Sequence, residues 1–457
     1  MKVLLLLLIT TCITVCQTVR LYNPSQPNVI IILADDLGWK DAGCTGSEIY
    51  ETPNIDRLAG LGIIFENSYA SSCVCSPTRA SIMTGKYPAR LKLTSWIKGG
   101  GGAKTSNHLA LEEKTIAEAF SENGYTTGLI GKWHLGNVDY WPTKQGFQVT
   151  VGEPHNGSPA GGYYLPNRMK LSNVKKGDYL TDILSREAVT FIEDHREKPF
   201  FLYQSYHSVH TPTHGKLSYT ESEKRRMAKH QDKWNPKYSA MVKSLDDGVG
   251  AILNSLIEND LLENTIILFS SDNGGFKNVT NNFPLREGKG YNYEGGNRIP
   301  TIIYDPRSPL QNTTCETPII SNDYYPTLLD LCDLQLQPNQ HLDGVSFKKL
   351  ILEKNADLER ENLFWHFPHF SPQGGMPSSV ILRNNWKLIE FYKQTGVNNY
   401  ELYDLSDDPS EQNNLVSTEL EKTELLKRLL QEWKSETDAE LLPKHGNFPR
   451  WYKYDTF

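Results

Sequence analysis

The residues with the clearest chemical potential surround a cysteine at positions 75–79, with the sequence CSPTR. Ser76 suits the N-cap of a helix, Pro77 suits its first turn, and Gly85 suits its end. This pattern would place Cys75 beside the partly positive start of a short helix, where an anion is stabilised. Taken alone, the segment fits a buried or disulfide-bonded cysteine better, so the other polar clusters decide its role.

Two acidic clusters could provide oxygen ligands for a metal ion. Asp35 and Asp36 are adjacent, and Asp272 and Asn273 form a similar pair far along the chain. Adjacent carboxylates usually mark a solvated turn, but two matching clusters of carboxylate and amide oxygens suit Ca²⁺ or Mg²⁺. Neither cluster has histidines and cysteines at the spacing of a zinc site. The sequence therefore predicts a site for a hard cation.

A lysine and several histidines form the next candidates. Lys132 and His134 lie two positions apart, so in an extended segment their side chains point the same way and can enter one pocket. His210 precedes a Thr-Pro pair that stiffens its loop, and His207 and His214 compete with it for any role. Taken alone, such a lysine is usually a surface charge and such histidines are usually structural.

A further lysine, Lys289, lies in the glycine-rich stretch 286–300. A flexible backbone there would present the Lys289 ammonium to an anion. The alternative is an ordinary surface loop with solvated charges.

The elements that must position these residues alternate between strands and helices. Continuous apolar runs predict buried strands at residues 29–34, 125–130, 199–205 and 264–271. Helices are predicted at residues 116–122, 182–193 and 239–256. This alternation predicts an α/β domain. The polar clusters directly follow the four strands, and ligands of open α/β sheets gather beyond the carboxyl ends of strands.

The pattern of predicted elements changes in the C-terminal part, which predicts a smaller α+β unit. Residues 380–392 predict an antiparallel hairpin, residues 401–405 another strand and residues 418–437 a helix. Just before them, residues 365–375 carry aromatic rings, imidazoles and an amide. This stretch would suit either sugar rings or packing between the two units.

The whole chain has 457 residues and a formal net charge of −7, which argues against general nucleic-acid binding. A lysine followed by an apolar run predicts a signal peptide over residues 1–16 and a secreted or periplasmic protein. Lipoprotein anchoring at Cys16 is the weaker alternative. We expect a catalytic domain at residues 24–350, a C-terminal subdomain at residues 351–457, and no transmembrane segment.

Seven cysteines are present, and Cys12 and Cys16 belong to the predicted signal region. If Cys75 is chemically converted, an even number remains, as expected in an oxidising compartment. By sequence distance, Cys315 and Cys332 are the favoured disulfide pair.

These blocks, in this order, resemble the type I, formylglycine-dependent sulfatases. The resemblance rests on residues 75–85, both acidic pairs, the Gly-Lys-Trp-His segment 131–134, the loop of Lys289 and the block 401–415. It extends over nearly the whole mature chain and looks most like bacterial carbohydrate sulfatases and arylsulfatases. The implied fold is alkaline-phosphatase-like, with a central mixed sheet flanked by helices and a smaller C-terminal α+β subdomain.

The resemblance implies a role for each candidate, with no departure from the family pattern. A formylglycine-forming maturation enzyme would convert the cysteine to 3-oxoalanine (formylglycine), whose hydrate would attack the sulfur of a sulfate ester. The implied ligands of Ca²⁺, with Mg²⁺ as the alternative, are Asp35, Asp36, the modified Cys75, Asp272 and Asn273. The implied catalytic residues are Cys75, Arg79, which would hold the formylglycine, Lys132 and Lys289, which would bind sulfate oxygens, and His134 and His210, which would transfer protons.

The resulting prediction is a secreted sulfuric ester hydrolase that acts on a sulfated carbohydrate, such as ulvan, carrageenan or their oligosaccharides. A phosphomonoester or phosphonate hydrolase of the same superfamily is one alternative, although these enzymes favour a Thr or Ser nucleophile with zinc, or a different loop around the cysteine. A secreted glycan-binding protein without catalysis is the other alternative, although every expected polar residue is present.

Overall fold

A mixed eight-stranded sheet forms the centre of the molecule, in the strand order β10-β2-β9-β8-β1-β7-β5-β6. Its strands are β1 (Asn28–Ala34), β2 (Ile63–Phe65), β5 (Thr126–Gly131), β6 (Val149–Val151), β7 (Phe200–Ser205), β8 (Thr265–Ser271), β9 (Thr301–Tyr304) and β10 (Thr313–Cys315). Strand β9 runs antiparallel to β2 and β8, whereas β8, β1, β7, β5 and β6 are parallel. The predicted mixed sheet is therefore confirmed.

The computed structural model describes residues 26–442 except 100, 153–154, 166–168, 170, 229–234 and 393–398. The predicted signal peptide, residues 1–16 with Cys12 and Cys16, lies outside the described residues. Within them, no helix combines the length and the apolar character that crossing a membrane requires.

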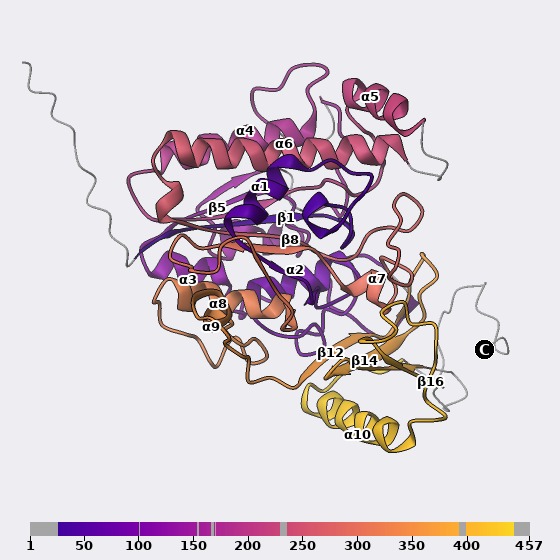
Figure 1. Cartoon of the computed structure of the whole chain (residues 1–457). Helices are drawn as coiled ribbons and strands as arrows, with labels where there is room; N and C mark the ends of the chain where they lie inside the picture. Colours follow the sequence, from indigo (N-terminus) through magenta and orange to yellow (C-terminus); the bar gives the residue numbers. More distant parts are fainter. Residues whose placement is uncertain are drawn as a thin grey trace, which may run out of the picture.

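Helices cover both faces of the central sheet (Figure 1). One layer contains α1 (Pro53–Leu61), α4 (Leu180–Asp194), α5 (Leu217–Met227) and α6 (Pro236–Glu258). The other contains α2 (Cys75–Thr84), α3 (Ile116–Glu122), α8 (Tyr324–Leu331) and α9 (Lys348–Leu352). Because successive side chains of a strand point to opposite faces, β1 supplies both cores: Ile30 and Ile32 face the first layer, and Val29, Ile31 and Leu33 face the second.

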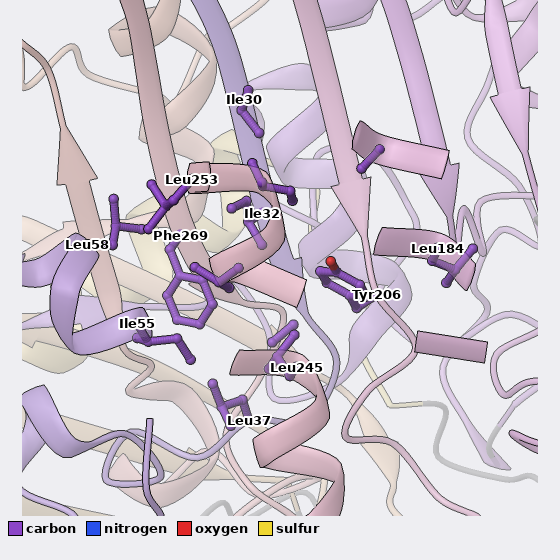
Figure 2. Close-up of a cluster of buried hydrophobic side chains, with 14 of the residues drawn as sticks. Ile30, Ile32, Leu37, Ile55, Leu58, Leu184, Tyr206, Leu245, Leu253 and Phe269 are labelled. Carbon is purple, nitrogen blue, oxygen red and sulfur yellow. The ribbon is translucent and has the colours of Figure 1, made fainter. Parts of the chain in front are cut away.

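Figure 2 shows the core beneath the first layer, where Ile30 and Ile32 of β1 lie near Phe269 of β8. Leu245 and Leu253 of α6 pack against these residues, and all five side chains are fully buried. Burial on both faces explains why the central strands read as continuous apolar runs in the sequence.

The predicted central elements are confirmed, and their register brings the candidate residues to one edge. Ala34 of β1 pairs with Ser271 of β8, and Ser205 of β7 pairs with both Leu33 of β1 and Gly131 of β5. The four strands therefore end at the same level, and the residues that follow them start from a common edge. Helix α3 has the predicted bounds, and α4 and α6 extend slightly beyond theirs.

A second, antiparallel sheet follows near the C-terminus, in the order β12-β14-β15-β16. Its strands are β12 (Asn362–Phe367), β14 (Ser378–Arg383), β15 (Trp386–Phe391) and β16 (Asn399–Asp404), and α10 (Leu420–Glu436) packs against it through Leu426, Leu430 and Trp433 (Figure 1). The predicted hairpin and C-terminal helix are therefore confirmed. The domain boundary at residues 350–351 stays a prediction.

The favoured disulfide between Cys315 and Cys332 is wrong, because both are free thiols in the structure. Cys315 ends strand β10 at the margin of the sheet, whereas Cys332 follows α8 and is buried against the hydroxyl of Tyr125. Both side chains pack in the core beneath the second helix layer without forming a disulfide, which short sequence separation does not reveal.

Candidate active site

Cys75 is the first residue of helix α2, and its side chain is almost fully buried. The expected position at the start of a short helix is confirmed, and Gly85 ends the helix in the left-handed conformation, with φ 69°. Ser76 is not the N-cap, because Val74 holds that position and no side chain caps the helix. The Ser76 hydroxyl instead donates to the carbonyl of His134 at 3.0 Å, so it ties the helix start to the segment after β5.

The imidazole of His134 lies directly against the cysteine. Its Nδ1 is 3.3 Å from Cys75 Sγ and 3.2 Å from Ser76 Oγ. Burial, together with the charge of Lys132, lowers the pKa of His134 well below its ordinary value. A neutral imidazole at this position is able to accept a proton from a group at the position of Sγ.

Three carboxylates and three cations alternate around the strand ends. Lys132 Nζ is 2.6 Å from Asp35 Oδ2, and Lys289 Nζ is 2.7 Å from Asp36 Oδ1. The Arg79 side chain pairs with Asp272, which belongs to the segment after β8, through Nε at 2.8 Å and Nη2 at 2.7 Å. All six side chains are buried: Asp35, Asp36, Arg79, Lys132, Asp272 and Lys289. Such charges remain ionised inside a protein only when they are paired.

The pKa values of the carboxyl groups reflect these pairings. Burial would raise the pKa of Asp36, but Lys289 and His210 hold it well below its ordinary value. Burial and the charge of Asp35 raise the pKa of Asp272 to about 6, against the opposing effect of Arg79. The three cations therefore balance the three carboxylates one for one, and Asp272 is the carboxyl group whose charge is least favoured.

The donor set fits an oxygen-preferring cation. Asp35 Oδ1 and Asn273 Oδ1 are buried and accept no hydrogen bond from the described residues. Such orphaned oxygens cost free energy unless a ligand satisfies them. Asn273 Nδ2 donates to Asp36 Oδ1 at 2.8 Å, which connects the two acidic pairs as predicted. Ligand atoms of Asp35, Asp36 and His210 also lie within 4.8 Å of one another.

Of His207, His210 and His214, only His210 has a ring nitrogen paired with a carboxylate of this cluster. Its Nε2 is 3.8 Å from Asp36 Oδ2, and its Nδ1 is 2.6 Å from the carbonyl of Thr211. Burial and Lys289 lower the pKa of His210 to about 3. His207 is buried without a partner for either ring nitrogen among the described residues, and His214 is exposed.

A cavity of about 300 Å³ opens above these residues, and we call it the central cavity. Its lining combines residues that the sequence pointed to with residues that it did not. They are Val74, Cys75, Trp96, Ile97, His134, Gly157, Ser158, His210, Lys289, Pro372 and Gln373. Four catalytic candidates therefore line the same cavity: Cys75, His134, His210 and Lys289. Arg79 and Lys132 do not line it, and each is paired with a buried carboxylate, Asp272 and Asp35 respectively.

Trp96, Ile97, Gly157, Ser158, Pro372 and Gln373 lie in irregular segments, and their position at the cavity depends on the tertiary fold. The sequence signals are a glycine run at 99–102 beside Trp96 and the stretch 365–375, which contains Pro372 and Gln373. In the stretch 365–375, Trp365 and His369 are buried, and they bond to Ala70 and Thr94. Of the two interpretations of this stretch, packing fits these two rings, while Pro372 and Gln373 of the same stretch line the cavity.

Two family models and several known proteins match the sequence of this chain. Residues 27–334 match the family described as Sulfatase, and residues 288–438 match the one described as N-sulphoglucosamine sulphohydrolase, C-terminal. A protein from Formosa agariphila described as Sulfatase is 32% identical over 90% of this chain and 88% of its own length. Arylsulfatase A of Homo sapiens is 30% identical over 85% of this chain and 83% of its own length.

Solved structures agree with the sequence comparisons. The crystal structure of Ps i-CgsB in complex with k-i-k-neocarrahexaose superposes with a TM-score of 0.79 and 30% identity. The superposition covers 90% of this chain and 93% of that one. The chain described here belongs to the sulfatase family and is a sulfuric ester hydrolase.

Proposed function

We propose that this enzyme removes sulfate from a sulfated carbohydrate and that its nucleophile is formylglycine made from Cys75. The observation that carries the proposal is the position of Cys75 at the partly positive start of α2, 3.3 Å from His134 and on the floor of the central cavity. A sulfate group in this cavity would lie among the ammonium and imidazole groups that line it.

We assign the divalent cation to Asp35, Asp36, Asp272, Asn273 and the modified Cys75. The orphaned oxygens of Asp35 and Asn273 support this assignment. Oxygen ligands favour Ca²⁺ or Mg²⁺ over zinc, and we favour Ca²⁺. When bound, the cation would neutralise charge that develops on the sulfuryl oxygens.

The lysines and Arg79 hold charges in place around the reacting group. Lys289 lines the cavity, and its ammonium is able to move from Asp36 to a sulfate oxygen when a substrate enters. Lys132 is fully buried beside Asp35, so it balances the charge of that carboxylate and contributes positive potential to the sulfate position. Arg79 bridges Asp272 and Ser205, which fixes the start of α2 relative to the sheet.

We assign the two cavity histidines to different proton transfers. His134 contacts the position of Sγ, so it would take a proton from the nucleophilic group. His210 lies beside Asp36, which favours its protonated form, and would give its Nε2 proton to the leaving sugar oxygen once Lys289, which disfavours that form, has moved to the sulfate. A sugar alkoxide is a poor leaving group, so this proton is needed for a carbohydrate ester.

The substrate class is supported by the relatives. Ps i-CgsB is described as binding k-i-k-neocarrahexaose, and it is 30% identical to this chain. We therefore propose a sulfated polysaccharide such as carrageenan or ulvan, or an oligosaccharide derived from it. The apolar segment within residues 1–16 supports secretion, and a formylglycine-forming enzyme is the implied maturation partner.

The test is release of inorganic sulfate from carrageenan and ulvan oligosaccharides, with matched phosphate monoesters as competing substrates. We expect sulfate release that Cys75→Ala abolishes while the protein remains folded. Faster hydrolysis of the phosphate monoesters would favour a phosphohydrolase instead. Tight oligosaccharide binding without any turnover in protein that carries formylglycine would favour a non-catalytic glycan-binding protein.

A further inference from the structure

A second cavity of about 200 Å³ lies beside the central cavity. Its wall includes Ile97, Lys98, His108, Tyr140 and His155. None of the residues that line it among those described is acidic. It takes no part in the chemistry assigned above.

The two cavities have one lining residue in common, and nearby residues of a second segment line one or the other. Ile97 lines both of them, and Lys98 lines only the second. On another side, His155 lines the second cavity, while Gly157 and Ser158 line the central one. A chain of linked rings that has one ring in the central cavity would therefore reach the second cavity across Ile97.

The floor of the second cavity is built around two stacked rings. The imidazole of His108 and the phenol of Tyr140 have centroids 3.7 Å apart and planes inclined by 17°. Gly136 lies behind them with φ 139°, and a Cβ there would come within 2.6 Å of Tyr140 Cβ and 3.0 Å of His108 Cβ. Glycine is therefore required for the stack to form. Planar rings with an apolar face and polar edges suit the C–H face of a sugar ring.

The side chain of Lys98 supplies positive charge at this cavity. Lys98 is exposed, and within the described part of the chain its ammonium has neither a hydrogen bond nor an ion pair. His108 and His155 add ring nitrogens that make no hydrogen bond to described residues. With cationic and imidazole groups and no carboxylate, the cavity favours an anionic guest.

The loop that carries Ile97 and Lys98 is attached to the C-terminal part of the chain at both of its ends. Thr94 Oγ1 is 2.8 Å from His369 Nε2 on one side. On the other side, β4 (Gly101–Gly102) pairs with β13 (His369–Phe370), and the amide of Ala103 donates to the carbonyl of Pro368 at 3.0 Å. These attachments reduce the entropy that the loop would lose when a substrate binds.

We propose that the second cavity binds the sugar residue next to the one that bears the scissile sulfate, and that it selects a carboxylate or sulfate group on that neighbour through Lys98. This inference rests on the proposed carbohydrate substrate. The enzyme would then recognise two adjacent sugar residues, and the second would be a uronate or another sulfated sugar.

The test compares disaccharides that share one sulfated residue and differ in the neighbour, which is neutral, a uronate or a second sulfated sugar. Lys98→Met removes the charge and keeps the chain length, Lys98→Arg restores the charge, and Lys104→Met is the matched control, because Lys104 is exposed on the same segment but lines neither cavity. We expect Lys98→Met to raise KM for the charged disaccharides about tenfold relative to the neutral one, the equivalent of about 1.4 kcal/mol. Lys98→Arg should recover most of this loss, and Lys104→Met should cause none.

An effect confined to the uronate or to the second sulfate would support the proposal and identify the group that Lys98 contacts. Equal KM changes on all three disaccharides, or no change, would overturn it. The same disaccharides titrated calorimetrically into Cys75→Ala protein give a readout that needs no turnover. Absence of sulfate ester hydrolysis would therefore count against the proposed function alone, while weaker binding of the charged disaccharides after adding Lys98→Met would still support the second cavity.

Discussion

A buried charge cluster holds the segment that carries Lys289 against the C-terminal sheet, and removal of its lysine gives a strong prediction. Lys387 Nζ of β15 is 2.9 Å from Glu294 Oε1 in α7 (Glu294–Asn297) and 2.8 Å from Glu411 Oε1. The backbone amide of Glu294 donates to Glu411 Oε2 at 2.7 Å, and Tyr69 donates to Glu294 Oε2 at 3.1 Å. Lys387, Glu294 and Glu411 are all buried, so Lys387→Met would leave two carboxyl groups without their shared cation.

Breaking such a pair from one side costs about 3–5 kcal/mol of unfolding free energy, because an uncompensated buried charge remains. The loss should depend on pH. Burial and Glu294 raise the pKa of Glu411 from 4.5 to about 7, against the effect of Lys387. A raised carboxyl pKa stabilises the fold at low pH, and this contribution is lost as pH rises through the folded-state value. Removing Lys387 raises the pKa of Glu411 further and takes away a cation that lowers the pKa of Glu294, so the deficit should be smaller near about pH 5 and larger near about pH 8.

Urea unfolding followed by tryptophan fluorescence at these two pH values measures the effect. The double variant Lys387→Met/Glu411→Gln should recover much of the stability at the higher pH, because it removes one of the two buried charges. Lys427→Met is the control: it breaks a 2.7 Å pair between a partly exposed lysine and the exposed Glu424, and it should change stability by about 1 kcal/mol or less at either pH. A deficit for Lys387→Met that is equal at both pH values, or no larger than that of Lys427→Met, would refute the reasoning.

Three further predictions concern the site and the core. His210→Ala should lower kcat/KM on a sugar sulfate by about 10²–10⁴-fold and on an activated aryl sulfate far less, because a phenolate leaves without a proton; equal losses on both substrates would remove His210 from the leaving-group role. Chelation should reduce sulfate release, and Ca²⁺ or Mg²⁺ should restore it; metal analysis of active enzyme that finds only zinc would contradict the assignment to Asp35 and Asn273. Leu253→Ala, in the core of Figure 2, should lower the unfolding free energy by about 2–5 kcal/mol in a denaturant titration, and a loss below about 1 kcal/mol would mean that the core collapses around the missing side chain.

The central strands were predictable because burial on both faces makes them continuous apolar runs. Residues 29–34 and 264–271 match β1 and β8 almost end to end, and the acidic pairs that follow them meet at the predicted edge. Strands such as β2 and β10 were not predicted, because each is three residues long and is a strand only through its neighbours in the sheet.

The sequence predicted less of the site than of the fold. Polar side chains that directly follow strands could be placed, since the parallel register fixes their level. Ser76 was given the wrong role, because its local helix signal did not reveal that His134 offers a carbonyl at 3.0 Å. Trp96, Ser158 and Gln373 come to the central cavity from irregular segments far apart in sequence, and only tertiary packing brings them together.

The central claim is that the residue at position 75 is the converted nucleophile of a sulfatase. Mass spectrometry of the peptide that carries residue 75, taken from enzyme that is actively releasing sulfate, tests this claim most directly. The account predicts an aldehyde, or its hydrate, in place of the thiol, in proportion to the active fraction of the preparation. Full sulfate-releasing activity from protein in which Cys75 remains entirely a thiol would contradict it.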